Sequence, residues 1–144
     1  MNDDLKSLYR ETLLRHSRNP SNRIDLPNAT AEAELKNPLC GDLITIRLVA
    51  NSERIEQAAF EAQCCSICMA SASMLTETVT NQATPDARKF ALSLIDSLQD
   101  SDVQLDLSEN DDLNALAGVK SFPSRIRCAT LPWEAMLAAL SAEA

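Results

Sequence analysis

The sequence contains few glycines, few aromatic residues and no long hydrophobic run. Only two glycines, Gly41 and Gly118, occur among 144 residues, and aromatic residues make up 3%. In a chain this poor in glycine we expect Gly41 to lie where the backbone needs a tight turn. No segment reaches membrane-spanning length or has the form of a signal peptide, which favours a cytoplasmic protein without membrane contact.

Basic residues are scarce as well. The chain contains 13 Lys and Arg residues and 21 Asp and Glu residues, so its formal net charge is -8. This balance argues against nucleic acid and anionic membranes as partners, because both require a basic surface. The length suffices for a hydrophobic core, and we find no repeat or linker. We therefore predict a single domain over residues 1–144.

Hydrophobic periodicity predicts a three-stranded antiparallel meander followed by helices, and small residues after the cysteines would let the first of these helices lie close to the sheet. Helical spacing indicates a first helix that begins at Asp3 and Asp4 and ends before Pro20. His16, near its end, is interpreted as a locally hydrogen-bonded residue, with metal ligation as the alternative. Period-two alternation then predicts three strands joined by short turns, over residues 31–36, 43–49 and 55–63.

The second half is predicted to be mainly helical. A helix should follow the cysteine-rich stretch at 64–68, and another should be capped by Thr84 and have Pro85 in its first turn. The later expectations are an acidic surface loop short of core residues at 100–112, a short helix over 113–117 stopped by Gly118, and a last helix beginning near Pro132.

The five cysteines cannot all pair within one chain, and in a reducing compartment such clusters more often bind metal or react. Cys65 lies at a strand-to-helix junction, where the positive end of a helix favours a thiolate. Our hypothesis is that the fold brings Cys40, Asp42, Cys65 and Cys128 together. Three thiolates and a carboxylate could hold zinc or an iron–sulfur centre. The alternative for Cys64 and Cys68 is that they are small buried hydrophobic residues.

The segment from Cys65 to Cys68 also allows another interpretation. Cys-x-x-Cys at the start of a helix is the arrangement of thioredoxin-type thiol–disulfide oxidoreductases. Such a fold needs a parallel β-α-β unit around the motif, whereas here an antiparallel meander is predicted before it.

Four stretches resemble the IscU/SufU family, which also contains the N-terminal domain of NifU. They come in family order and cover nearly the whole chain: His16-Ser17-Arg18-Asn19-Pro20-Ser21-Asn22, Asn37-Pro38-Leu39-Cys40-Gly41-Asp42, Cys65-Ser66-Ile67-Cys68-Met69-Ala70-Ser71-Ala72-Ser73-Met74, and Phe122-Pro123-Ser124-Arg125-Ile126-Arg127-Cys128-Ala129-Thr130-Leu131. The region after Thr84 is similar to the insertion of the SufU branch. Arg127 stands where IscU proteins have a histidine, and their chaperone-recognition segment is replaced by Phe122 to Ile126.

The resemblance implies an α+β fold with the metal and sulfur site at one exposed end. It implies that Cys40, Asp42, Cys65 and Cys128 bind zinc, and that Cys40 is the nucleophile. Where the family usually has glycine and serine, this chain carries Cys64 and Cys68.

The implied function is iron–sulfur cluster biogenesis, as a zinc-containing acceptor of persulfide sulfur. The implied partners are a pyridoxal-phosphate cysteine desulfurase and downstream iron–sulfur assembly proteins. The alternative within the same pathway is an IscU-type scaffold that assembles a [2Fe–2S] cluster on the same ligands. Whether such a protein is a sulfurtransferase-like enzyme or a non-enzymatic scaffold stays open at this point.

Overall fold

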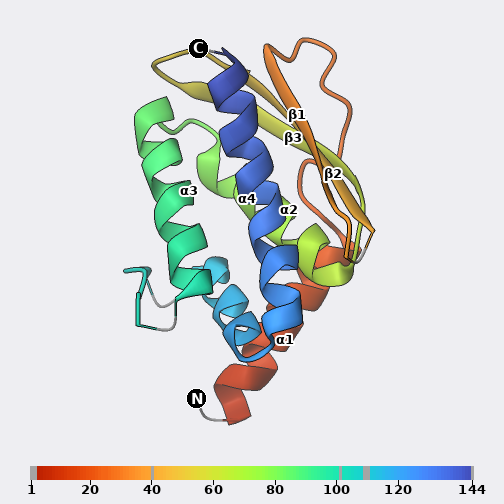
Figure 1. Ribbon diagram of the computed structural model, residues 1–144, viewed down its shortest axis with the longest axis vertical. Coiled ribbons are helices and arrows are strands. Elements are labelled where there is room, and N and C mark those ends of the chain that lie inside the picture. The colour runs from red at the N-terminus through yellow and green to blue at the C-terminus, as the bar shows by residue number, and fades with distance from the viewer. Residues whose placement is uncertain (1–2, 40, 101, 109–110, 144) are drawn as a thin grey trace.

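The computed structural model describes residues 3–39, 41–100, 102–108 and 111–143 (Figure 1). The elements follow one another as α1 (Asp3–Arg18), β1 (Ala31–Asn37), β2 (Asp42–Ala50), β3 (Ile55–Gln63), α2 (Ser66–Val79), α3 (Thr84–Gln99), the 3-10 helix η1 (Asp112–Ser121) and α4 (Pro123–Glu143). Among the described residues, no helix is both long and apolar enough to cross a membrane.

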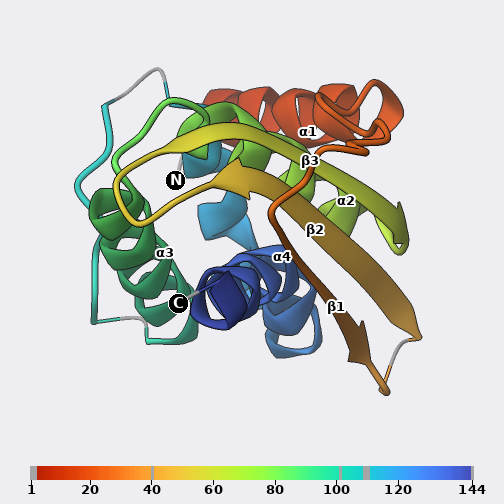
Figure 2. The ribbon, with the colours of Figure 1, turned by 90° about the horizontal axis from the view of Figure 1, so that it is seen from above.

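The three strands form one antiparallel sheet in the order β1-β2-β3, which confirms the predicted meander. Alternate residues of β2, namely Ile44, Ile46 and Leu48, are fully buried, and Ile46 lies opposite the buried Phe60 of β3. Helix α4 packs against β1 and β2, and α2 packs against β3 (Figure 2). The predicted α+β architecture is therefore confirmed, and the core lies between the sheet and the helices.

Three helix boundaries differ from the predictions. Ala83 is the N-cap of α3, and the hydroxyl of Thr84 instead donates to the carbonyl oxygen of Asn51 at 2.7 Å, which ties α3 to the β2–β3 turn. Gly118 does not stop its helix, because η1 continues to Ser121. Helix α4 begins at Pro123 and contains Pro132 in its interior.

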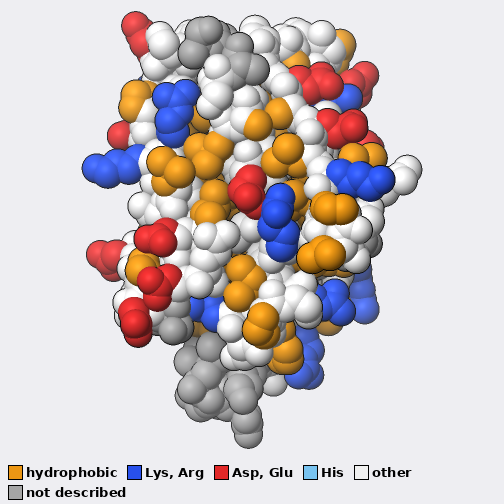
Figure 3. All heavy atoms as spheres, viewed as in Figure 1, with side chains coloured by type: hydrophobic (Ala, Val, Ile, Leu, Met, Phe, Trp, Pro, Cys, Tyr) orange, Lys and Arg blue, Asp and Glu red, His pale blue; other side chains and the backbone are white. Residues whose placement is uncertain are grey.

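The segment after α3 is also better packed than predicted. Residues 102–108 contain no helix or strand, as expected for a loop, but Leu105 and Leu107 are partly buried against the core. The intervening Asp106 is exposed. Acidic side chains gather over this part of the surface, at the lower left of Figure 3. The segment therefore covers hydrophobic surface while it presents charge to solvent.

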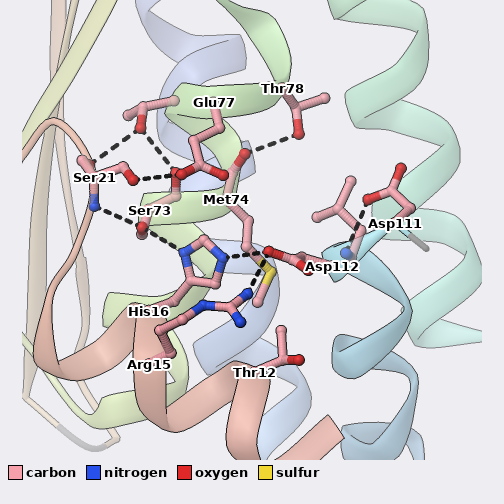
Figure 4. A network of polar contacts seen from close by, with 12 residues as sticks. Thr12, Arg15, His16, Ser21, Ser73, Met74, Glu77, Thr78, Asp111 and Asp112 are labelled. Carbon is pink, nitrogen blue, oxygen red and sulfur yellow. Dashed lines mark hydrogen bonds and ion pairs between the residues drawn. The ribbon is translucent and has the colours of Figure 1, made fainter. Parts of the chain in front are cut away.

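His16, on α1, makes polar contacts with α2 and η1 (Figure 4). Its Nδ1 lies 2.7 Å from the hydroxyl of Ser73 on α2, and its Nε2 lies 2.8 Å from Oδ2 of Asp112 on η1. The hydroxyl oxygen of Ser73 also accepts a hydrogen bond from the backbone N–H of Ser21 at 2.7 Å. Arg15 donates to the same Asp112 oxygen at 2.8 Å. We call these five residues the His16 network.

The network corrects the expectation for His16. The residue is hydrogen-bonded, but its partners are remote in sequence and not local. Because Ser73 accepts from Ser21, its own proton is free to be donated to Nδ1, so that Nε2–H donates to Asp112. Ser73 is fully buried and cannot act as a nucleophile on an external substrate. The His16 network is thus a structural clamp between α1, α2 and η1.

The pKa of Asp112 reflects this clamp. Partial burial alone raises the pKa, but the hydrogen bond with His16 and the positive charge of Arg15 outweigh it and hold the pKa below the usual 3.8. A carboxylate with a lowered folded pKa stabilises the fold above its unfolded pKa. It loses that contribution as the pH falls through the folded value.

We expect Asp112→Asn to lower the free energy of unfolding at pH 7 by about 1 kcal/mol, since the lost hydrogen bonds are charge-assisted but partly exposed. The difference from the unmodified protein should shrink below about pH 4, where Asp112 gains a proton in the unfolded chain. Urea denaturation at a series of pH values measures both effects. Asp106→Asn removes the same charge from an exposed loop and should change little. An equal loss in both variants would contradict the clamp.

The two glycines form a matched pair for a second test. Gly41 has φ +76°, whereas Gly118 has no such strained φ, and an added Cβ would meet nothing within 4 Å at either position. We therefore expect Gly41→Ala to cost about 1 kcal/mol of backbone strain without a clash. Gly118→Ala should be neutral or stabilise by roughly 0.5 kcal/mol, because it restricts the unfolded chain. Thermal denaturation checks the order, and equal melting temperatures for the two variants would disprove the assignment.

Candidate metal centre

Three of the four predicted site residues come together at the end of the sheet that carries the β1–β2 turn. Asp42 is the first residue of β2, Cys65 is the N-cap of α2, and Cys128 lies in the second turn of α4. One carboxylate oxygen and the two sulfur atoms all lie within 4.8 Å of one another. The hypothesis that the fold gathers these residues is therefore supported for Asp42, Cys65 and Cys128.

The sheet register explains why Asp42 and Cys65 meet. Leu43 pairs with Gln63, the last residue of β3, so the start of β2 lies beside the strand-to-helix junction. Oδ1 of Asp42 accepts a hydrogen bond from the backbone N–H of Cys65 at 3.0 Å. Cys65 has extended backbone angles and its thiol makes no capping hydrogen bond. Its sulfur is therefore left available as a ligand.

Cys128 is fixed by the packing of α4 against α2. The hydroxyl of Ser71 donates to the carbonyl oxygen of Ala129 at 2.6 Å, and the indole N–H of Trp133 donates to Ser71 at 3.1 Å. Pro132 has no N–H, so it cannot donate the helical hydrogen bond to the carbonyl of Cys128, four residues earlier. Small side chains on α2 allow this close contact.

The donor set fits a soft or borderline divalent metal ion such as zinc. In a tetrahedral site with bonds of about 2.3 Å to sulfur, ligand atoms lie about 3.8 Å apart, which is compatible with the grouping observed. Oδ2 of Asp42 is buried and has no hydrogen-bond partner among the described residues. An unsatisfied buried carboxylate oxygen is costly unless a cation faces it. The orphaned oxygen is thus the observation that best supports a metal ligand.

The pKa of Cys128 also supports a metal site at this place. Burial raises the pKa of the Cys128 thiol, and the neighbouring Cys65 and Asp42 raise it further. Without a cation the Cys128 thiol resists ionisation, because its thiolate would be buried and would face other negative charge at short range. A bound divalent cation reverses this balance and holds the thiols as thiolates.

The fourth predicted ligand, Cys40, lies outside the described residues. The turn around it is held by Asn37, whose backbone oxygen accepts the N–H of Gly41 at 2.8 Å and whose side chain accepts the N–H of Leu39 at 3.1 Å. The positive φ of Gly41 confirms that this glycine provides a turn. Leu39 is 95% exposed. The role of Cys40 stays a prediction.

Cys64 and Cys68 do not belong to the group formed by Asp42, Cys65 and Cys128. Cys68 is fully buried, Cys64 is partly exposed, and both are free thiols. A hydrogen bond with Cys64, and then burial, raise the pKa of the Cys68 thiol. The buried position of Cys68 agrees with the interpretation of this cysteine as a small buried hydrophobic residue.

The thioredoxin-type interpretation is not favoured. The sheet before the motif is antiparallel, and Cys65 is grouped with Asp42 and Cys128. Arg127 does not supply a ligand either. Its guanidinium lies 3.0 Å from Glu134 on the same helix, and a guanidinium has no lone pair for a metal.

Two further features are poorer candidates for the site. His16, Glu77 and Asp112 offer ligand atoms within 4.8 Å of one another. However, both nitrogens of His16 are already hydrogen-bonded, and Arg15 supplies the positive charge beside Asp112.

A cavity of about 270 Å³ lies between α3, the 102–108 segment and η1. Five leucines line it together with Ala117 and polar residues, and none of the lining residues is a cysteine.

Comparison with known proteins identifies the relatives of this chain. The family described as "NifU-like N terminal domain" matches residues 8–139. The "Zinc-dependent sulfurtransferase SufU" of Bacillus subtilis (strain 168) is 38% identical over 137 residues, which cover 94% of this chain and 90% of the relative. The "Iron-sulfur cluster assembly scaffold protein IscU" of Streptococcus pyogenes serotype M1 is 34% identical over 142 residues, which cover 97% and 87%.

A solved structure supports the same fold. The crystal structure of the SUF-system protein FiSufU from Fervidobacterium islandicum AW-1 has a TM-score of 0.83, with 23% identity over 96% of this chain and 99% of that chain. The expected IscU/SufU resemblance is thereby confirmed. This chain belongs to the family of NifU-like N-terminal domains that includes SufU and IscU.

Proposed function

We propose that this chain is an iron–sulfur cluster assembly protein of the SufU type, which takes persulfide sulfur from a pyridoxal-phosphate cysteine desulfurase. The observation that carries the proposal is the grouping of Asp42, Cys65 and Cys128, of which Asp42 has a buried oxygen without a hydrogen-bond partner among the described residues. The 38% identity to a protein named as a zinc-dependent sulfurtransferase supports zinc at this place.

The residues have separate tasks in this proposal. Asp42, Cys65 and Cys128 hold the metal, each from a different element of the rigid core. Bound zinc supplies positive charge that keeps nearby thiols deprotonated. Cys40, which precedes Gly41 in the sequence, is the nucleophile in this proposal, as the resemblance to the SufU branch implies.

Sulfur transfer then follows simple thiol chemistry. The Cys40 thiolate attacks the outer sulfur of the desulfurase persulfide, the sulfur–sulfur bond of the donor breaks, and the donor cysteine leaves as a thiolate. One sulfur atom moves and no external oxidant or reductant is needed. The exposed side chain of Leu39 beside this turn leaves it open to a protein partner.

We expect Cys65→Ser and Cys128→Ser to lose zinc. The loss of affinity should exceed the roughly 10- to 100-fold typical when only a residue hydrogen-bonded to a ligand is changed. Metal analysis of protein purified without oxygen measures this. Cys64→Ser is the matched control, because it changes the neighbouring thiol and should retain zinc. Full zinc content in the Cys128→Ser protein would argue against this ligand set.

We further expect Cys40→Ser to abolish sulfur acceptance from a cysteine desulfurase supplied with L-cysteine. Mass spectrometry of the tryptic peptide 37–47, which contains only this cysteine, detects the added sulfur atom. Cys68→Ser should still accept sulfur at Cys40. A Cys40→Ser protein that accepts as much sulfur as the unmodified one would rule out the assigned nucleophile.

The second candidate function is a scaffold that assembles a [2Fe–2S] cluster, and the 34% identity to a protein named as an IscU scaffold favours it. Thiolates and a carboxylate bind iron as well as zinc. Visible absorption decides between the two. A colourless zinc protein supports the acceptor, whereas a brown protein with iron and acid-labile sulfide establishes the scaffold.

A further inference from the structure

The cavity between α3, residues 102–108 and η1 is open to solvent and has leucine side chains from all three segments in its lining. Five of the lining residues are leucines, and the volume is about 270 Å³. Gln104 and Ala117 also line the cavity and are exposed, so it reaches the surface of the protein. The metal centre and the sulfur transfer proposed above make no use of it.

Two of the polar lining residues are engaged in hydrogen bonds within the chain. The side-chain amide of Asn114 donates to the carbonyl oxygen of Ser108 at 2.8 Å, and Nζ of Lys120 donates to the carbonyl oxygen of Val103 at 3.3 Å. These bonds tie the 102–108 segment to η1, and the leucines between them pack against the core. The leucines are thus the part of the lining that can hold an occupant, through the hydrophobic effect.

The volume of the cavity indicates the size of its occupant. An apolar cavity of about 150 Å³ is enough for benzene, whereas pockets for drug-sized ligands begin at roughly 300 Å³. At about 270 Å³, this cavity exceeds the first value and falls short of the second. It therefore suits one or two apolar side chains, such as those of leucine and phenylalanine, better than a whole small molecule.

Carboxylates flank the lining residues along the chain. Asp96, Asp102 and Asp106 are exposed, and each lies within two residues of a lining residue. None of the three forms an ion pair with another described residue. Lys120 is the one basic residue of the lining, and acidic side chains gather over this part of the surface (Figure 3). Positive charge on the occupant is therefore favoured.

We propose that this cavity docks a basic segment of another protein, which inserts one or two apolar side chains among the leucines while its Lys or Arg residues face Asp96, Asp102 and Asp106. An apolar anchor in a pocket supplies affinity, and opposite charge supplies orientation and a faster encounter. The net charge of -8 favours such a partner over a second copy of this chain, because two copies repel each other. The proposal does not depend on the function proposed above.

The test uses the whole chain as purified and a fluorescein-labelled peptide, Lys-Lys-Leu-Phe-Lys-Lys, as the probe. Fluorescence anisotropy at low and at moderate ionic strength gives the dissociation constant. A second peptide has Ser-Ser in place of Leu-Phe, and a third has glutamate in place of every lysine. The apolar and the charged parts of the probe are thereby tested separately. Thermal denaturation establishes that each protein variant is folded.

Ala117→Phe places an aromatic ring in the cavity. It should weaken binding of the first peptide by about tenfold or more, because the apolar side chains of the peptide then stay in water. Ala117 is exposed, so the change leaves the core intact. Ala138→Phe is the matched control, because Ala138 is an exposed position of α4 outside the lining, and it should bind as the unmodified chain does. Ala117→Leu is the second variant if Ala117→Phe does not fold.

The charged part is tested with two double variants of equal net charge. Asp102→Asn with Asp106→Asn removes two carboxylates beside the cavity, whereas Glu53→Gln with Glu56→Gln removes two exposed carboxylates at the β2–β3 turn and in β3. We expect only the first double variant to weaken binding several-fold and to reduce its dependence on ionic strength.

Equal affinities of the Ala117→Phe and Ala138→Phe proteins would overturn the proposal, as would no binding of the first peptide to the unmodified chain. Equal binding of the Ser-Ser peptide would leave charge alone as the cause, and tighter binding of the glutamate peptide would indicate an anionic occupant, so both reject it. A dimer of the unmodified chain that Ala117→Phe dissociates also rejects it, because the occupant would be a second copy. Metal content and sulfur acceptance at Cys40 are separate measurements, so either proposal can fail alone.

Discussion

The hydrogen bond from the backbone N–H of Cys65 to the carboxylate of Asp42 joins the sheet to the first helix that follows it, at the place where the candidate metal ligands meet. It exists because the antiparallel register ends β3 beside the start of β2. A shift of one residue would turn the side chain of Asp42 to the opposite face of the sheet. The position of the cysteine cluster thus depends on the pairing of two strands.

At the same end of the molecule, potentially negative side chains lie close together, and a bound cation would offset their repulsion. Two thiols and a carboxylate lie within 4.8 Å of one another, and Asp42 and Cys128 are buried. Burial and these neighbours disfavour the thiolate of Cys128 unless a positive charge faces it. The contacts of Ser71 with Ala129 and Trp133 hold α4 in place, so the group is built into the core and not assembled by flexible loops. In a preformed site of this kind, metal binding would cost less conformational entropy, because the ligand residues are already ordered.

The sheet was largely predictable from the sequence because alternation of buried and exposed residues is a local property. The buried positions Ile44, Ile46 and Leu48 follow directly from it. The helix boundaries at Thr84, Gly118 and Pro132 were less predictable, because partners remote in sequence override local preference. Thr84 bonds to Asn51, and the interior Pro132 lies in a helix whose neighbouring residue Trp133 is fully buried in the core. His16 shows the same limit, since nothing near it in sequence indicates Asp112.

The sequence by itself determined the α+β class, the order of the strands and the motifs that resemble the IscU/SufU family, because periodicity and short motifs are read along the chain. Only the tertiary structure decided that one carboxylate oxygen of Asp42 is buried without a hydrogen-bond partner among the described residues, and that Asp42 lies beside Cys65 and Cys128. Both facts depend on which side chains meet in space. Burial and strand register determine these side-chain contacts, and neither can be derived from the spacing of residues in the chain.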